Sequence, residues 1–203
     1  MKKILFIVQL FLIFSSCNLN ETIRISNYDN PQKALLVIDM QIDYIDENGK
    51  FPIEKIQINN LIETVNNIIV DFNDNNYQII YFKRKFRKND VKNFFRNFAV
   101  VEGTAGVEID PRIHIVSNNI FDKFTPSAFS NKRFENLLIH NQINELYLCG
   151  VMADECVYET ALSAFDSGYI VNYYANAVGS SSIKNIENAI EKLKNKGINI
   201  IEY

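Results

Sequence analysis

The chain has 203 residues, a length that favours one domain and leaves no room for two of ordinary size. Hydrophobic residues make up 47% and charged residues 22%, a composition typical of a globular protein with a sizeable buried core. The formal net charge of −3 provides no overall attraction for nucleic acid, so we expect no nucleic-acid partner.

The first 17 residues have the pattern of an export signal. Met1-Lys2-Lys3 is basic, residues 4–14 are almost wholly apolar, and small residues follow up to Cys17. The apolar stretch is too short to cross a bilayer, which needs about 20 residues. Because the stretch ends at a cysteine, it resembles the signal of bacterial lipoproteins, in which that cysteine becomes lipidated.

We therefore expect an exported protein, anchored in a membrane through lipidated Cys17 and facing the periplasm or the cell exterior. Residues 1–17 would be the signal, residues 18–30 a polar tether and residues 31–203 the folded domain. An ordinary secretory signal and an uncleaved anchor are the alternatives for the first segment.

Strand-like and helix-like segments alternate along the rest of the chain. Continuous apolar runs predict strands at residues 34–39, 77–82, 120–124, 145–150, 170–174 and 198–200. Helices are predicted at residues 54–72, 132–141, 154–167 and 182–196, while residues 83–110 are long and irregular. This alternation predicts an α/β fold with three α-β-α layers and a mainly parallel, doubly wound sheet of about six strands.

Three residues with useful chemistry fall at or just after predicted strand ends: Asp39, Lys123 and Cys156. The carboxyl ends of parallel strands form one edge of a sheet, where ligands bind in open α/β folds. An Asp, a Lys and a Cys gathered at that edge could build a nucleophilic site. Each residue alone has a more ordinary explanation, namely a helix cap or turn, a solvated lysine, and a buried helix cysteine.

Cys156 falls in the first turn of a predicted helix, with Asp154 as the expected N-cap. Backbone N–H groups and the helix dipole stabilise a thiolate at such a position. The carboxylates of Asp154 and Glu155 raise a thiol pKa, so a reactive Cys156 needs a cation, which Lys123 could supply. Cys149 lies in an apolar run and is expected to be a buried small hydrophobe, not the disulfide partner of Cys156.

Four short motifs occur between residues 34 and 180. They are Leu36-Val37-Ile38-Asp39-Met40-Gln41 with Tyr44; Val101-Glu102-Gly103-Thr104-Ala105-Gly106; Lys123-Phe124 with Ser127-Ala128-Phe129; and Leu148-Cys149-Gly150-Val151-Met152-Ala153-Asp154-Glu155-Cys156-Val157. No single motif is specific. Together and in this order they resemble the motifs of the isochorismatase-like superfamily of cysteine hydrolases, the nicotinamidase-related amidohydrolases.

The resemblance implies a role for each residue of a catalytic triad. Asp39 would take the thiol proton as general base, and Lys123 would hold Asp39 and stabilise developing negative charge. Cys156 would attack a carbonyl carbon and form a thioester, which water then hydrolyses.

The resemblance also implies a cis peptide bond between Val151 and Met152. The N–H of Met152, together with that of Cys156, would then face the oxyanion of the substrate. Three further residues are expected at the substrate pocket: Gln41, Tyr44 and Phe129.

Nicotinamidases of this family bind a metal through an Asp-x-His pair and a further His after the second strand. Here residues 83–90 read Lys-Arg-Lys-Phe-Arg-Lys-Asn-Asp, and the two histidines of the chain are His114 and His140. We therefore expect no metal and no other cofactor.

The expected function is metal-independent hydrolysis of the C–N bond of a small-molecule amide through a thioester. Three alternatives stay open. They are isochorismatase-type hydrolysis of a vinyl ether, which does not need the cysteine, a redox role for Cys156, and a non-catalytic exported binding protein.

Two features of the irregular segment allow two interpretations each. The basic run at residues 83–88 is a solvated loop, or it attracts a carboxylate-bearing substrate or an anionic lipid surface. Phe94, Phe95 and Phe98 pack in the core or between subunits, which we favour, or form a lid over the pocket. The resemblance also allows a homo-oligomer, because relatives often form dimers or larger assemblies.

Overall fold

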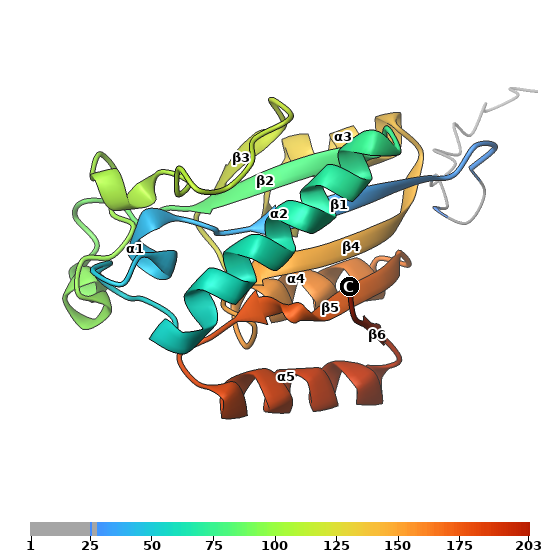
Figure 1. The fold of residues 1–203 in the computed structure, drawn as a ribbon. Helices are drawn as coiled ribbons and strands as arrows, with labels where there is room; N and C mark the ends of the chain where they lie inside the picture. Colours follow the sequence, from blue (N-terminus) through green and yellow to red (C-terminus); the bar gives the residue numbers. More distant parts are fainter. Residues whose placement is uncertain (1–24, 26–27) are drawn as a thin grey trace, which may run out of the picture.

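The computed structural model describes residue 25 and residues 28–203 (Figure 1). The expected signal at residues 1–17, its lipidation site Cys17 and most of the expected tether at residues 18–30 lie outside the described residues and stay predictions. None of the helices in the described part of the chain is long and apolar enough to cross a membrane.

Six strands form a single sheet in the order β3-β2-β1-β4-β5-β6, and every pair of neighbouring strands is parallel. The strands are β1 (Gln32–Ile38), β2 (Gln78–Arg84), β3 (Ile120–Lys123), β4 (Ile143–Val151), β5 (Ile170–Gly179) and β6 (Asn199–Ile201). The predicted α/β fold with a doubly wound sheet is therefore confirmed, and the sheet is parallel throughout.

Helices cover both faces of the sheet, which gives three layers (Figure 1). The α-helices are α1 (Ile42–Ile45), α2 (Ile58–Asp74), α3 (Lys132–His140), α4 (Cys156–Asp166) and α5 (Ile183–Lys196). Short 3-10 helices are η2 (Lys55–Gln57), η3 (Val91–Arg96), η4 (Ala105–Val107) and η5 (Ala128–Ser130). The apolar residues of α1 and α2 pack on one face of the sheet, and those of α3, α4 and α5 pack on the other.

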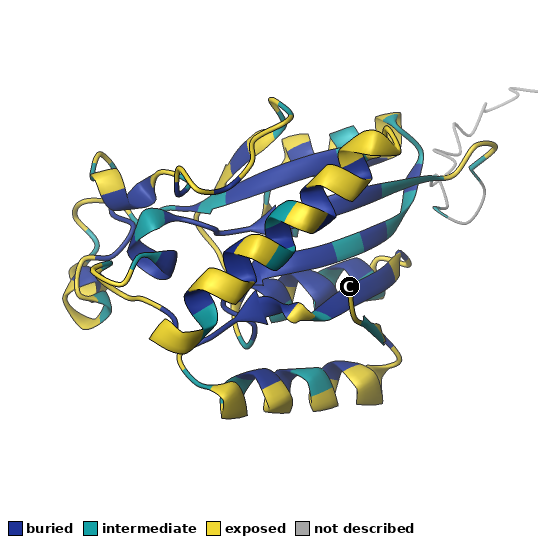
Figure 2. Cartoon of the chain, in the orientation of Figure 1, coloured by how far each residue is buried: buried dark blue, intermediate teal, exposed yellow. Residues whose placement is uncertain are grey.

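The central strands are buried on both faces, as Figure 2 shows, which explains their continuous aliphatic sequences. Leu36 and Ile38 of β1 contribute to the cluster under α4, whereas Leu35 and Val37 contribute to the cluster under α2. Alternate residues of one strand therefore supply both layers of the core.

The start of α4 differs from its prediction. The helix begins at Cys156 with Glu155 as N-cap, and no side chain caps it. Asp154, the expected cap, instead accepts a hydrogen bond from the hydroxyl of Ser180 after β5. The tight turn that follows β4 causes the difference, because Ala153 donates its N–H to Gly179 and residues 152–155 are held against the end of β5.

Gly150 allows β1 and β4 to approach closely just before the site. It pairs with Ile38 and has a φ of +120°, and a Cβ atom there would lie 2.0 Å from the carbonyl oxygen of Ile38. A side chain at this position would push β4 away from the backbone that leads into Asp39.

We expect Gly150→Ala to destabilise the protein more than Gly168→Ala, the matched control. Gly168 also has a positive φ, but a Cβ atom there would have nothing within 4 Å. The control should lose about 1–2 kcal/mol through backbone strain, and Gly150→Ala a further ~1–3 kcal/mol through overpacking. Urea unfolding of both variants measures the difference, and equal losses would contradict the steric argument.

Candidate active site

The candidate site lies at the carboxyl ends of the central strands and begins with a buried ion pair. The Nζ of Lys123 lies 2.7 Å from Oδ2 of Asp39, and both side chains are completely buried. Lys123 is on β3, and β2 lies between β3 and β1. The lysine therefore reaches over the end of β2 to the residue that follows β1.

The backbone of Asp39 turns sharply as it leaves β1. Its φ is +54°, in the left-handed region that residues other than glycine rarely adopt. Its N–H donates to the carbonyl oxygen of Phe82 at 3.1 Å, and its own carbonyl oxygen accepts from Gln41 at 2.7 Å. These two bonds fix the turn that directs the carboxylate toward Lys123.

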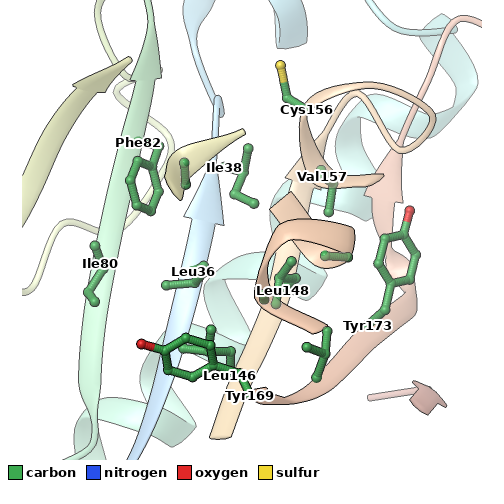
Figure 3. Close-up of a cluster of buried hydrophobic side chains, with 14 of the residues drawn as sticks. Leu36, Ile38, Ile80, Phe82, Leu146, Leu148, Cys156, Val157, Tyr169 and Tyr173 are labelled. Carbon is green, nitrogen blue, oxygen red and sulfur yellow. The ribbon is translucent and has the colours of Figure 1, made fainter. Parts of the chain in front are cut away.

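Cys156 brings a thiol to the same place from the first turn of α4. Figure 3 shows its sulfur pointing away from the apolar cluster that contains Val157 and Leu148, beyond the carboxyl end of β1. The residue is 6% exposed and lines a cavity together with Asp39. The structure therefore brings Asp39, Lys123 and Cys156 together.

Burial and neighbouring charge set the protonation of this group. Burial raises the pKa of the Cys156 thiol to about 12; the Asp39 carboxylate adds to this rise and the Lys123 ammonium opposes it. Burial also raises the pKa of Asp39 above its ordinary value, against the lowering effect of Lys123. The thiol is therefore protonated at neutral pH, and the adjacent carboxylate is a stronger base than an exposed aspartate.

Two residues that line this cavity have backbone N–H groups without an acceptor among the described residues. The peptide bond between Val151 and Met152 is cis. Neither the N–H of Met152 nor that of Cys156 donates a hydrogen bond to another residue in the described part of the chain, although the neighbouring N–H groups of Ala153, Glu155 and Val157 do. Both residues line the cavity, so these donors are available to a negatively charged oxygen.

The cavity has a volume of about 260 Å³ and a largely aromatic wall. Its lining residues are Asp39, Tyr44, Phe51, Phe86, Phe95, Arg96, Ala99, Met152, Glu155 and Cys156. Its size suits a small molecule rather than a polymer segment.

Of the three residues expected at the pocket, only Tyr44 lines this cavity. Gln41 is completely buried, and its side-chain amide bonds to the backbone of Arg84 and Val107. Phe129 packs against Phe134 in the core between the sheet and α3. The two residues therefore do not occupy the positions expected for them, since hydrogen bonding and core packing hold them elsewhere.

Three aromatic side chains of the irregular segment also lie elsewhere than expected from the sequence. Phe94, Phe95 and Phe98 are 74%, 84% and 50% exposed, so the expectation of core packing within the chain is wrong. Phe95 lines the cavity, as does Phe86. One indication of a cavity wall here was present in the sequence, namely several phenylalanines beside a basic run. The spacing of residues along a long loop does not, however, determine which of them reach the cavity.

Asp43 explains the glycine motif at residues 103–106. Its carboxylate accepts a hydrogen bond from the N–H of Val100 at 2.7 Å, and a Cβ on Gly106 would lie 2.0 Å from the same carboxyl group. The motif therefore allows the irregular segment to close against α1, which carries the cavity residue Tyr44.

No group of three or more His, Cys, Asp or Glu side chains in the described residues is arranged to hold a metal ion. The end of β2 and the residue after it present Lys83, Arg84 and Lys85, whose positive charges repel a divalent cation. The side chains present here therefore do not fit the metal site of nicotinamidases.

We expect Lys123→Met to lose about 3–5 kcal/mol of stability, because it leaves the Asp39 carboxylate buried without its ion-pair partner. Loss of the ammonium removes an effect that lowers the pKa of Asp39, so that pKa rises further above its unfolded value of about 3.9. A raised folded-state pKa favours stability at low pH, and the benefit is lost as pH rises. The deficit should therefore grow from about pH 4 to about pH 7.

Urea unfolding at the two pH values measures this effect. Lys85→Met, which breaks the more exposed ion pair with Asp122, is the control and should lose less than about 1 kcal/mol. Adding Asp39→Asn to Lys123→Met should recover part of the loss. A deficit independent of pH in Lys123→Met would contradict the assigned buried charge.

Comparison with known proteins agrees with this fold. The profile of the isochorismatase domain matches residues 33–203. The isochorismatase family protein YddQ of Bacillus subtilis (strain 168) is 26% identical over 154 residues, which cover 74% of this chain and 79% of that protein.

Among solved structures, nicotinamidase PncA from Bacillus subtilis is 27% identical, with a TM-score of 0.76 over 84% of this chain and 100% of that chain. An isochorismatase-like hydrolase from Alkaliphilus metalliredigens has the same fold, with a TM-score of 0.77 at 22% identity over 84% and 94% of the two chains. Since the domain profile covers nearly all of the folded part, the chain belongs to the isochorismatase family of hydrolases.

Proposed function

We propose that this protein hydrolyses the C–N bond of a small amide through a thioester on Cys156, without a metal ion. The observation that carries the proposal is the buried Asp39–Lys123 pair beside a protonated thiol at the end of a small cavity. A carboxylate base, a cation and a sulfur nucleophile at one point are the groups that acyl transfer requires.

In the first step Asp39 takes the proton of Cys156 while the sulfur attacks the amide carbonyl carbon. The carbonyl oxygen becomes negatively charged and accepts hydrogen bonds from the free N–H groups of Met152 and Cys156. Asp39 then gives its proton to the leaving nitrogen, the C–N bond breaks, and ammonia or an amine departs from the thioester.

In the second step water replaces the amine. Asp39 takes a proton from the water as the oxygen attacks the thioester carbon, and the same two N–H groups stabilise the second oxyanion. The C–S bond then breaks, the proton returns to the sulfur, and a carboxylic acid leaves. The enzyme ends in its starting protonation state, so no further reactant is needed.

Lys123 stabilises the single negative charge of this group before and after the proton transfer. When the proton moves from sulfur to Asp39, the negative charge moves from carboxylate to thiolate, and the ammonium stays beside both. Moving the negative charge from the carboxylate to the thiolate costs less free energy in a buried site when a fixed cation stabilises the charge at both positions. Even beside that cation the thiol pKa is about 12, so the thiolate is rare at neutral pH until Asp39 takes its proton during the attack.

The likeness to a nicotinamidase of Bacillus subtilis supports an amide as the substrate class, since that enzyme is named for an amide. The basic side chains at the end of β2 do not fit a metal ion. This supports a mechanism that uses only the side chains and backbone of the protein. Hydrolysis of a vinyl ether is the alternative within the family and does not depend on the cysteine.

We expect Cys156→Ala to abolish amide hydrolysis, with a loss of at least about a thousandfold in kcat, because the nucleophile is removed. The measurement is ammonia release across a panel of small amides. Cys149→Ala is the matched control, because Cys149 is a buried cysteine of β4 that packs on the α2 side of the sheet. Full activity in Cys156→Ala would rule out the thioester route and favour vinyl ether hydrolysis.

We also expect kcat/KM for an amide to fall as the pH drops through the pKa of Asp39. The base acts as a carboxylate, so activity is present above this pKa, which burial places above the ordinary value of about 3.9. A pH profile of kcat/KM measures it. A rate that instead rises tenfold per pH unit up to the thiol pKa of about 12 would show that Asp39 does not serve as the base.

A further inference from the structure

Arg84 is a buried cation that the proposed mechanism does not use. It ends β2, is 8% exposed, and pairs in register with Lys123 of the neighbouring strand β3. Side chains of residues in register project from the same face of a sheet, so two cations lie side by side at this edge. Asp39 is paired with Lys123.

The guanidinium of Arg84 has no carboxylate partner. Its Nη1 is fully buried without a hydrogen-bond partner, and no hydrogen bond or ion pair joins the guanidinium to any described residue. Arginine stays protonated in proteins, so the group cannot escape this cost by losing its charge. An unpaired buried charge is strongly unfavourable, which indicates that a counter-charge comes from outside the described residues.

The guanidinium lies directly behind one residue of the cavity wall, although Arg84 is not itself a lining residue. Its Cζ is 4.6 Å from the centre of the Phe86 ring, and Phe86 lines the cavity. The Cζ of Arg96, another lining residue, lies 3.8 Å from the same ring. The charge of Arg84 also lowers the pKa of Asp39 and of Tyr44, although burial raises both more strongly, so it acts on groups within the cavity.

Gln41 holds Arg84 in place. Its Oε1 accepts from the N–H of Arg84 at 2.7 Å, and its Nε2 donates to the carbonyl oxygen of Arg84 at 2.9 Å. The end of β2 is thereby fixed to the turn that carries Asp39. A cation held in this way is preorganised for a ligand, because its backbone does not have to be ordered on binding.

The other charges near the cavity do not neutralise Arg84. Arg96 is paired with Asp90 at 2.9 Å. Glu155 lines the cavity but is exposed, and it makes no ion pair with Arg84. Arg84 is thus the buried cation of this region that lacks an anion within the described residues.

We propose that Arg84, assisted by Arg96 on the same Phe86 ring, binds the carboxylate of the substrate, so that the substrate is a small amide that also carries a carboxylate. The inference rests on the proposed amide hydrolysis and adds the class of substrate to it. A guanidinium binds a carboxylate through two parallel hydrogen bonds, which a neutral group of the same shape cannot replace. The rest of the molecule contacts Tyr44 and Phe86, and the amide carbon lies at Cys156.

The test compares amides that differ only in this charge. Succinamate is paired with succinamide, and 4-carbamoylbenzoate with 4-acetylbenzamide. Their kcat/KM values are measured with the intact enzyme, and their dissociation constants with Cys156→Ala, which does not turn them over. Each measurement is repeated with Arg84→Gln, Arg96→Gln and the control Arg87→Gln, whose side chain lies over Phe124 outside the cavity.

We expect the carboxylate of at least one pair to bind and react roughly ten- to a hundredfold better than its neutral partner. Arg84→Gln should remove most of this preference, Arg96→Gln part of it, and Arg87→Gln none. Arg84→Gln should also keep or raise the melting temperature, since it removes an unpaired buried charge, whereas a merely structural arginine would lower it.

Equal binding of charged and neutral partners, or no binding by any of them, overturns the inference, as does an equal loss in Arg87→Gln. Two further outcomes separate it from the proposed function. Cys156-dependent hydrolysis without preference for the carboxylate retains the amidase and rejects this anion site. If carboxylates bind in an Arg84-dependent way but no amide is hydrolysed, the anion site is supported and the amidase proposal is contradicted.

Discussion

The ion pair between Asp39 and Lys123 is the interaction on which the rest of the site depends. Its two charges are completely buried, so they are stable only together. The pair joins the turn after β1 to the end of β3 across β2, and it sets the charge around the thiol of Cys156. One contact therefore contributes to the fold at the end of the sheet and to the chemistry there.

Several residues that touch no substrate keep this arrangement in place. Gln41 ties the turn after β1 to the end of β2, and Gly150 lets β4 approach β1 closely enough to bring Cys156 beside Asp39. Asp43 holds the N–H of Val100, so the long segment between β2 and β3 closes beside the cavity. The motifs thus contain, besides Asp39, Lys123 and Cys156, residues that fix the backbone around the cavity.

The fold, and the three residues that the structure brings together at the end of the sheet, could be predicted from sequence because they depend on local patterns. Apolar runs of β1 and β4 mark buried strands, and Asp39 and Cys156 follow them at short distance. The cavity wall could not be predicted in this way. Phe95 and Arg96 reach it through a loop whose course depends on long-range contacts, such as that of Asp43 with Val100. Gln41 was expected in the substrate pocket but is not there. Its position two residues after Asp39 does not show whether its side-chain amide faces a substrate or bonds to the backbone.

The position of Lys123 at the edge of the sheet affects how stably the site stays assembled. It is the last residue of β3, a strand of four residues that forms one edge of the sheet and pairs only with β2. Edges and short strands open more readily than central strands, because fewer hydrogen bonds must break. We expect transient fraying of this edge to separate the ammonium from Asp39 while β1 and β4 stay folded. The local stability of one peripheral strand, more than the stability of the whole domain, would then limit how long the site stays assembled.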